Sequence, residues 1–174
     1  MKPKLTAIIR EQISLRRKKN LDISDLISGY DICGEDLSNT TIEFCNRMDD
    51  NISRCNFAGA RLGKEGVITN WSRANAKGCN FKDTKFLGTF WCRYTDFRNS
   101  TFIHAQVINV DYKFADFRGC DFCYAAFSVG TNNALGSKFD DKFFKDMAEQ
   151  WNIGILTKDE YDKYLKWKQN NDNI

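Results

Sequence analysis

Apolar side chains recur at every fifth position of this chain from Leu37 to Phe127. An α-helix repeats every 3.6 residues or so and a strand about every 2, and neither produces a five-residue spacing. The pattern instead predicts a short repeat that winds into a solenoid. Of the 19 repeat centres, 18 are apolar, and Arg47 is the exception. The centres are Leu37, Ile42, Arg47, Ile52, Phe57, Leu62, Val67, Trp71, Ala76, Phe81, Phe86, Trp91, Phe97, Phe102, Val107, Tyr112, Phe117, Phe122 and Phe127.

Two further preferences accompany the centres at fixed offsets. The residue two positions earlier is small, except at Glu35, Asp50 and Glu65, and the residue directly before the centre is often Asp or Asn. Large and small inward side chains fill a narrow tube without voids, and Asp and Asn suit tight corners. We therefore expect the centre and its small partner to face inward. The small residues are Thr40, Cys45, Cys55, Ala60, Thr69, Ala74, Cys79, Thr84, Thr89, Thr95, Ser100, Ala105, Val110, Ala115, Cys120 and Ala125.

This pattern resembles the pentapeptide-repeat family, whose loose consensus is Ala-(Asp/Asn)-Leu-x-x. The best matching triplets are Cys55-Asn56-Phe57, Ala74-Asn75-Ala76, Cys79-Asn80-Phe81, Ala115-Asp116-Phe117 and Cys120-Asp121-Phe122. The resemblance covers about 95 residues. It implies an all-β solenoid, a right-handed quadrilateral β-helix with four pentapeptides per coil.

Coils of 20 residues make stacking partners predictable. The expected pairs are Phe57 on Leu37, Phe117 on Phe97, Phe122 on Phe102 and Phe127 on Val107. The expected structural core includes Phe57, Phe81, Phe86, Phe97, Phe102, Phe117, Phe122 and Phe127.

The repeat slips twice. Val67 to Trp71 is four residues and Trp91 to Phe97 is six, so the two slips cancel. We expect a bulge or small loop at each, at residues 63–66 and at residues 92–95. Either Trp91 or Cys92 is the inward residue at the second slip. Irregularities in a regular scaffold often carry function, although tolerated irregularity is the simpler interpretation.

Chemical motifs are sparse. Cys120 and Cys123 form a C-x-x-C pair, but the repeat turns Cys120 inward and Cys123 toward solvent, and no second pair completes a zinc site. The single histidine, His104, is expected to face outward. The chain has no P-loop, no Gly-rich dinucleotide motif and no H-E-x-x-H. We therefore predict no enzyme activity, no catalytic or metal-binding residue and no cofactor.

The ends of the chain break the five-residue rhythm. Residues 4–19 predict a helix with Leu5, Ile8, Ile9, Gln12, Ile13 and Arg16 on one side. We divide the chain into an N-terminal cap (1–20), a repeat solenoid (21–130) and a C-terminal helical cap or dimerisation element (131–174). Ser137 with Asp140 and Thr157 with Glu160 resemble capping boxes that begin two helices. The candidate dimerisation residues of those helices are Phe139, Phe143, Met147, Trp151, Tyr161, Tyr164, Leu165 and Trp167.

The charge of the predicted solenoid is balanced. The chain has a net charge of +3, but residues 30–136 hold 12 acidic and 12 basic residues. Residues 66–100 form a basic band with six basic and two acidic residues. Its candidate interaction residues are Arg73, Lys77, Lys82, Lys85, Arg93 and Arg98. This band could meet an acidic protein or nucleic acid, but a solvated surface of mixed charge is the interpretation that we favour.

These observations predict a non-enzymatic scaffold that presents β-helix faces to an unidentified protein partner. The resemblance implies an alternative, because the quinolone-resistance type of this family mimics duplex DNA and binds type II topoisomerases such as DNA gyrase. That mimicry requires an acidic rod, which a balanced charge does not supply. A C-terminal homodimer is also predicted, and nucleic-acid binding is not. The sequence has no long apolar run and no signal peptide, so we expect a cytoplasmic protein without membrane contact.

Overall fold

The computed structural model describes residues 1–127 and 135–140. Within these residues the chain forms two helices, which are followed by six short strands. The helices are α1 (Ala7–Lys18) and α2 (Ser24–Ile27). The strands are β1 (Thr41–Ile42), β2 (Arg61–Asn70), β3 (Lys85–Trp91), β4 (Gln106–Val107), β5 (Val110–Asp111) and β6 (Ala126–Phe127).

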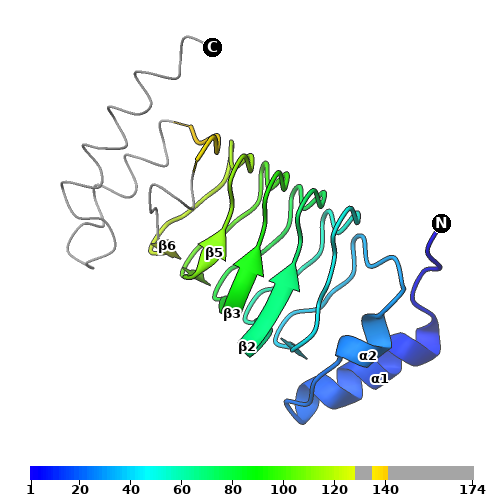
Figure 1. Ribbon diagram of the computed structural model, residues 1–174. Helices are drawn as coiled ribbons and strands as arrows, with labels where there is room; N and C mark the ends of the chain where they lie inside the picture. Colours follow the sequence, from blue (N-terminus) through cyan, green and yellow to red (C-terminus); the bar gives the residue numbers. More distant parts are fainter. Residues whose placement is uncertain (128–134, 141–174) are drawn as a thin grey trace.

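All of the strands pair in parallel, and each belongs to a different turn of one winding chain except β4 and β5, which share a turn. The sheet order is β1-β2-β3-β4-β6, and β5 also pairs with β3. Lys85 of β3 lies between Arg61 of the preceding coil and Gln106 of the following coil. The fold is therefore a parallel β-solenoid of about four turns. Figure 1 shows the coils stacked in a row, with α1 and α2 at the N-terminal end.

Each coil has four sides, and each side places one centre in the core. We name the sides by their outward residues, which are described below. The inward columns are Ile52, Ala76, Phe97, Phe117 and Phe139 for the charged side; Leu37, Phe57, Phe81, Phe102 and Phe122 for the amide side; Ile42, Leu62, Phe86, Val107 and Phe127 for the strand side; and Arg47, Trp71, Cys92 and Tyr112 for the apolar side.

The expected core is buried almost throughout. Each of the eight phenylalanines predicted to lie inside is at most 5% exposed. Phe117 stacks on Phe97 with ring centroids 4.9 Å apart, and Phe122 stacks on Phe102 at 5.1 Å. Val107 pairs with Phe127, and Leu37 N donates to Asn56 O in the coil that carries Phe57. The predicted stacking partners are thus neighbours in successive coils.

Small inward residues hold the coils together through hydrogen bonds as well as by their size. The hydroxyl of Thr84 donates to Phe57 O at 2.7 Å, and that of Thr95 donates to Trp71 O at 2.8 Å. Each bond joins a side chain to a turn carbonyl of the preceding coil. Because an unpaired buried carbonyl is costly, these bonds make Ser, Thr and Cys suitable at a position that alanine also fills.

Asp and Asn before the centre close the corners, as the sequence predicts. The Oδ1 atom of Asn56 accepts from Ala58 N at 3.2 Å, and that of Asp116 accepts from Arg118 N at 3.2 Å. Most corners are β-turns that end in a bond such as Ala60 N to Phe57 O, whereas the corner after Leu62 is a bulge. At these β-turns the second residue after the centre has positive φ, as in type II turns.

Arg47 is the one charged centre, and the structure gives its guanidinium carbonyl partners. It is 3% exposed, and it donates to Ile27 O at 2.8 Å and to Tyr30 O at 2.9 Å. Asp50 lies 3.4 Å away and supplies the opposite charge. These bonds tie the first full coil to the segment that contains α2.

Both slips of the repeat lie at the same corner, which differs from the sequence-based placement. Nine residues separate the centres Leu62 and Trp71, six separate Phe86 from Cys92, and five separate Val107 from Tyr112. The extra residues, four and one, add up to one pentapeptide. This is why the apolar spacing recovers its register after both. The first slip falls between Gly63 and Ile68, as expected.

The second slip corrects three assignments. The extra residue lies within β3, because the chain advances five residues from Lys85 to Phe90 but only four from Gln106 to Val110. Cys92 is the inward centre and Trp91 is half-buried. Thr89 is exposed and Phe90 fills the small inward position beside Cys92. The large Phe90 thus occupies the position that is normally small, and the small Cys92 occupies the centre that is normally large. The interior volume therefore stays filled.

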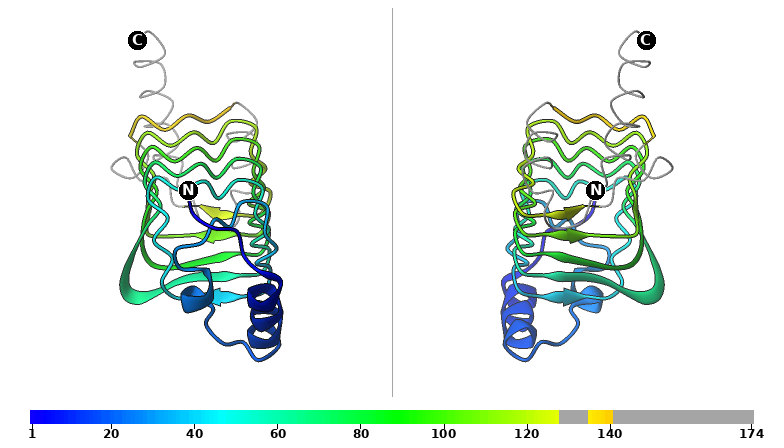
Figure 2. Two further views of the ribbon diagram at one scale, coloured as in Figure 1. Left: turned by 90° about the vertical axis from the view of Figure 1, so that its right-hand side faces the viewer. Right: turned by 90° about the vertical axis from the view of Figure 1, so that its left-hand side faces the viewer.

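Val67 is also not a core centre. It is half-buried within the long β2 bulge, and Thr69 and Trp71 are the next inward pair. Val67 lies five residues after the centre Leu62 only because the bulge is long enough to place an apolar residue there. Figure 2 shows β2 and β3 turning round this corner as continuous ribbons.

The N-terminal segment is an ion-paired cap. Helix α1 begins after Thr6, whose side chain accepts from Ile9 N, and it buries Ile13 against the core, as Leu5 is buried just before the helix. Ile8 and Gln12 are exposed, which corrects the predicted stripe. Four ion pairs join this segment to residues of the first coils, namely Lys2–Asp50, Lys4–Asp31, Arg10–Glu35 and Arg17–Asp36. A fifth, Arg16–Asp25, joins α1 to α2.

Ser137–Asp140 continues the solenoid instead of beginning a helix. Lys138 pairs with Asp116 in parallel, and the Ser137 hydroxyl donates to Tyr112 O at 2.6 Å. Phe139 is buried and stacks on Phe117 at 5.1 Å. Phe139 is therefore a core residue and not a dimerisation candidate. The other candidates, Phe143, Met147, Trp151, Tyr161, Tyr164, Leu165 and Trp167, and the Thr157 capping box lie outside the described residues.

Candidate functional site

Three of the buried cysteines act as structural hydrogen-bond donors. The thiols of Cys55, Cys79 and Cys120 donate to carbonyls of the preceding coil at 2.8, 3.0 and 3.0 Å. Burial raises the pKa of both Cys79 and Cys120 to about 12. A protonated thiol is a poor nucleophile, so these side chains serve packing.

Cys123 and His104 stand apart from the core. Cys123 is half-buried and points outward from the pentapeptide whose inward member is Cys120. His104 is exposed and stacks on Tyr124 with ring centroids 5.2 Å apart. Within the described residues, no group of three or more His, Cys, Asp or Glu side chains is placed to hold a metal ion. The two residues are backbone neighbours in successive coils, where His104 N donates to Cys123 O at 3.0 Å.

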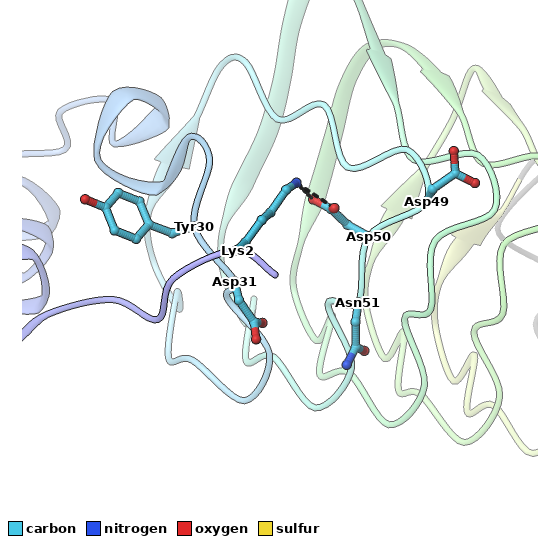
Figure 3. A pocket seen from close by; sticks show the side chains of 6 residues that line it. All are labelled: Lys2, Tyr30, Asp31, Asp49, Asp50 and Asn51. Atoms are coloured by element: carbon cyan, nitrogen blue, oxygen red, sulfur yellow. Dashed lines mark hydrogen bonds and ion pairs between the residues drawn. The ribbon is translucent and has the colours of Figure 1, made fainter.

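One cavity near the N-terminus gathers several carboxylates. It has a volume of about 190 Å³ and is lined by Lys2, Tyr30, Asp31, Asp49, Asp50 and Asn51. Figure 3 shows Lys2 reaching Asp50, while Asp31 and Asp49 point in other directions. Asp31 pairs with Lys4, and Asp49 pairs with Arg73. Because each carboxylate has its own cation, the cavity does not form a cation site.

The six candidate interaction residues do not share a face. Arg73 and Arg93 lie on the apolar side, Lys77 and Arg98 on the charged side, Lys82 on the amide side and Lys85 on the strand side. Four of them are ion-paired: Arg73 with Asp49, Lys77 and Arg98 with Asp96, and Arg93 with Asp111. The basic band of the sequence thus becomes a ring of mostly neutralised charges around two coils.

The charged side is a lattice of ion pairs. Asp96 contacts Lys77 at 3.1 Å and Arg98 at 2.9 Å, and Asp116 contacts Arg118 at 2.6 Å. Burial by itself raises the pKa of Asp116, but hydrogen bonds from Arg118 outweigh it and the pKa is lowered. Opposite charges alternate along the rod, so this side carries little net charge.

The amide side carries a ladder of side-chain amides over its first coils. The side-chain amide of Asn80 donates to Asn56 Oδ1 at 3.0 Å, and that of Asn56 donates to Asp36 Oδ1 at 2.9 Å. These ladders satisfy polar groups within the protein and bind the coils to one another.

The apolar side and the bulged corner beside it together expose most of the large apolar side chains in the described part of the solenoid. The apolar side comprises residues 46–49, 70–73, 91–94 and 111–114, and it meets the strand side at the bulged corner. Eight large apolar side chains in the described part of residues 31–140 are exposed, and seven lie on this side or corner. The eighth is Tyr124. The seven are Phe44, Met48, Ile68, Tyr94, Ile108, Phe114 and Leu135, each 44–58% exposed.

Repeat geometry orders these side chains. Tyr94 and Phe114 occupy equivalent corner positions in successive coils and have positive φ. Their rings therefore stack, with centroids 4.9 Å apart and planes within 9°. Phe114 N donates to Leu135 O, which extends the apolar surface by one coil. Arg93 covers the half-buried Trp91 at 5.6 Å and pairs with Asp111.

The sequence contains a signal for this surface, although an overall charge count does not find it. Four pentapeptides make one coil, so every fourth pentapeptide lies on the same side of the rod. The outward residues of one side can be recognised in the sequence only when the positions of the two slips are known. With the slips unplaced, Tyr94 and Phe114 appear unrelated to Phe44 and Ile68. Pairing of Ile68 with Thr89 in the bulge shows where the corner runs.

No family model matches the chain, and no curated protein matches it. In the described residues, no helix is long and apolar enough to cross a membrane.

Several solved structures are similar to the chain, and they are pentapeptide-repeat proteins. Rfr23 from the cyanobacterium Cyanothece 51142 has 14% identity over 56% of this chain and 60% of that chain, with a TM-score of 0.37. The protein alr5209 from Nostoc PCC 7120 has 12% identity over 80% and 99% of the two chains, with a TM-score of 0.33.

A plasmid-mediated fluoroquinolone resistance protein, QnrB1, is also similar. It has 16% identity over 71% of this chain and 92% of that chain, with a TM-score of 0.22. These likenesses concern the fold alone. The five-residue sides and parallel coils described above establish the chain's own fold as a pentapeptide-repeat solenoid.

Proposed function

We propose that this protein is a non-catalytic scaffold that binds a protein partner across its apolar side. The observation that supports this proposal is the segregation of the exposed large apolar side chains of the solenoid: within the described part of residues 31–140, seven of eight lie on one side and corner of the rod. Large apolar patches on otherwise polar proteins mark interaction surfaces. Interface centres are enriched in aromatic residues, Met and Arg, and this side carries Met48, Trp91, Arg93, Tyr94 and Phe114.

Rigidity supports the same proposal. The stacked rings of Tyr94 and Phe114 belong to corners that are fixed by backbone bonds, such as Tyr94 N to Lys113 O at 2.9 Å. A surface that is already ordered loses little conformational entropy on binding. The basic residues proposed from sequence contribute less, because four of the six are already ion-paired within the protein.

The alternative, a DNA mimic that binds and protects a type II topoisomerase, has weaker support. Such a mimic must present an array of free negative charge. On the charged side, Asp96 and Asp116 are both paired with arginines, and Asp49 and Asp111 of the apolar side are paired as well. A C-terminal homodimer also remains a proposal, and its remaining candidate residues lie outside the described part of the chain.

A capture experiment with matched variants tests the main proposal. The double variant Tyr94→Ser/Phe114→Ser removes the exposed stack, and Tyr124→Ser removes an exposed aromatic from another corner as a control. We expect cross-linked partner recovered from the native host to fall at least tenfold for the double variant and to be unchanged for the control. Equal recovery by all three proteins would contradict the proposal. Gyrase protection assayed on the same samples tests the alternative.

A further inference from the structure

Arg47 is the repeat centre that the five-residue pattern does not explain. A buried cation is costly unless an opposite charge compensates it, and an apolar side chain fills each of the other predicted centres. The Arg47 guanidinium donates to Ile27 O and Tyr30 O, which carry no net charge. Its Nε atom is buried and has no hydrogen-bond partner among the described residues. The carbonyl bonds alone therefore leave its charge uncompensated.

One carboxylate is shared between Arg47 and a second cation. Asp50 Oδ2 lies 3.4 Å from Arg47 Nη1, and Asp50 Oδ1 lies 2.6 Å from Lys2 Nζ. Figure 3 shows the Lys2 side chain reaching across to Asp50. Among the described side chains, no other carboxylate forms an ion pair with either cation. Two positive charges thus share one negative charge, and the group keeps one positive charge in excess.

A cavity opens beside these two cations. It has a volume of about 260 Å³, and its described lining residues include Lys2 and Arg47 but no Asp or Glu. The Arg47 side chain is 4% exposed and that of Lys2 is 45% exposed, so one cation is deep and the other is near the surface. Ser28 and Asn46 add polar groups to the lining. The cavity is therefore chemically suited to an anion.

The corner before Arg47 gives this cavity an apolar rim. Glu43 N donates to Asp22 Oδ1 at 2.9 Å, and Phe44 N donates to Ser24 Oγ at 2.8 Å. These bonds hold the corner against the segment that contains α2. The exposed side chain of Phe44 lines the cavity, together with that of Ile68 from the β2 bulge. Cationic and apolar groups thus meet at one opening.

We propose that this cavity binds the C-terminal residue of the partner protein. The terminal carboxylate meets Arg47 and Lys2, and the side chain of the same residue packs on Phe44 and Ile68. A C-terminal residue suits this lining because it carries a charge and an apolar group on one Cα. Guanidinium groups match carboxylates in geometry, and capture of a C-terminal carboxylate is a recurring mode of peptide recognition. The inference rests on the proposed function, because Phe44 and Ile68 belong to the apolar side and its corner.

Affinity selection from a synthetic library of random hexapeptides with free C-termini, with the full chain as the target, tests the proposal. We expect the selected peptides to end in an aliphatic or aromatic residue. The same peptide made as its C-terminal amide should bind at least tenfold more weakly, as measured by fluorescence anisotropy. An amidated peptide that ends in Glu should bind as weakly as the plain amide. Selection of no peptide, or equal affinity of the free acid and either amide, would overturn the proposal.

Charge variants show whether the two cations hold the carboxylate. Lys2→Gln should weaken binding of the selected free-acid peptide at least threefold. Lys4→Gln is the matched control, because Lys4 is an exposed lysine of the same segment that pairs with Asp31 and does not line the cavity. Binding to this control should be unchanged. Equal affinity of Lys2→Gln and the unmodified chain would contradict the assignment of the cavity.

Asp50→Asn gives a result that a merely structural role would not produce. It removes the carboxylate that competes for both cations, so the free-acid peptide should bind at least threefold more tightly. Asp83→Asn makes the same charge change on the amide side and should leave the affinity unchanged. Weaker or unchanged binding by Asp50→Asn would overturn the proposed role of the two cations.

The two proposals can fail separately. Partner capture that depends on Tyr94 and Phe114, together with a cavity that binds no free-acid peptide, would overturn only the C-terminal anchor. A cavity that binds such peptides, together with capture that ignores both aromatics, would overturn only the apolar-side interface.

Discussion

The charged side and the apolar side of the rod are built on the same pentapeptide, yet their surfaces differ. Both place one centre and one small residue inward, and both close their corners with Asp or Asn. Outside, one side carries the Lys77–Asp96–Arg98 ion pairs and the other the Tyr94–Phe114 stack. The repeat therefore constrains the interior and leaves the outward positions free to specify a surface.

Their corners differ as well. The corner between the charged and amide sides keeps one length, as in the Phe97 to Phe102 step. The corner between the strand and apolar sides has nine, six and then five residues between centres in successive coils. An apolar surface and a variable corner thus occur together, which is the arrangement expected where a scaffold carries its specific function.

If the charged and apolar sides differ only at their surfaces, removal of a buried aromatic ring should lower the free energy of unfolding equally beneath either side. Phe117→Ala acts beneath the charged side and Phe90→Ala beneath the bulged corner, and both rings are buried and in contact with other aromatics. Each should lower the free energy of unfolding by about 3–5 kcal/mol. Urea unfolding measures both. A much smaller loss for Phe90→Ala would show that the bulged corner is packed less well than the regular sides.

The next largest effect is the difference in stability between alanine substitutions at the bulged corner and at a regular corner. A Cβ added at Gly88 would lie 2.1 Å from Lys64 O, whereas one added at Gly78 meets nothing closer than Arg54 Cγ at 3.7 Å. Both glycines have positive φ, so both alanine variants share the same backbone strain. Gly88→Ala should be less stable than Gly78→Ala by about 1–3 kcal/mol, because the β2 bulge must move. Equal melting temperatures would mean that the bulge yields freely.

The smallest effect is electrostatic and belongs to the charged side. Asp116→Asn retains the oxygen that accepts from Arg118 N but removes the charge that pairs with Arg118. The native pKa of Asp116 is lowered, so its stabilisation is present above the unfolded pKa and is lost as the pH falls through the native value. We expect a loss below about 1 kcal/mol at pH 7.

That loss should vanish at acid pH, where the carboxyl is protonated in both states. Asp83→Asn is the control, because Asp83 has no ion pair among the described side chains. Melting curves recorded from pH 7 down to pH 2 compare the variants. A difference between Asp116→Asn and the unmodified chain that persists at the lowest pH would point to a steric cause.

The sequence alone determined the interior of this protein. Five-residue spacing identified the centres, and the offsets of Asp, Asn and small residues predicted the corners and the stacking of Phe117 on Phe97. These predictions succeed because each depends on residues within one pentapeptide and is repeated many times. A single exception such as Arg47 does not obscure a pattern that is repeated 19 times. The carbonyl partners of Arg47 come from the segment that contains α2.

The tertiary structure decided where the irregular residues go and which outward side chains meet. Val67 and Trp91 fit the five-residue spacing but are not core centres, because two insertions of unequal length lie at one corner. Ser137–Asp140 fits a helix cap but adds one more side to the solenoid, because Phe117 offers a stacking surface to Phe139. Side chains on successive coils become neighbours only once the length of each coil is fixed, so the apolar side is a property of the wound chain.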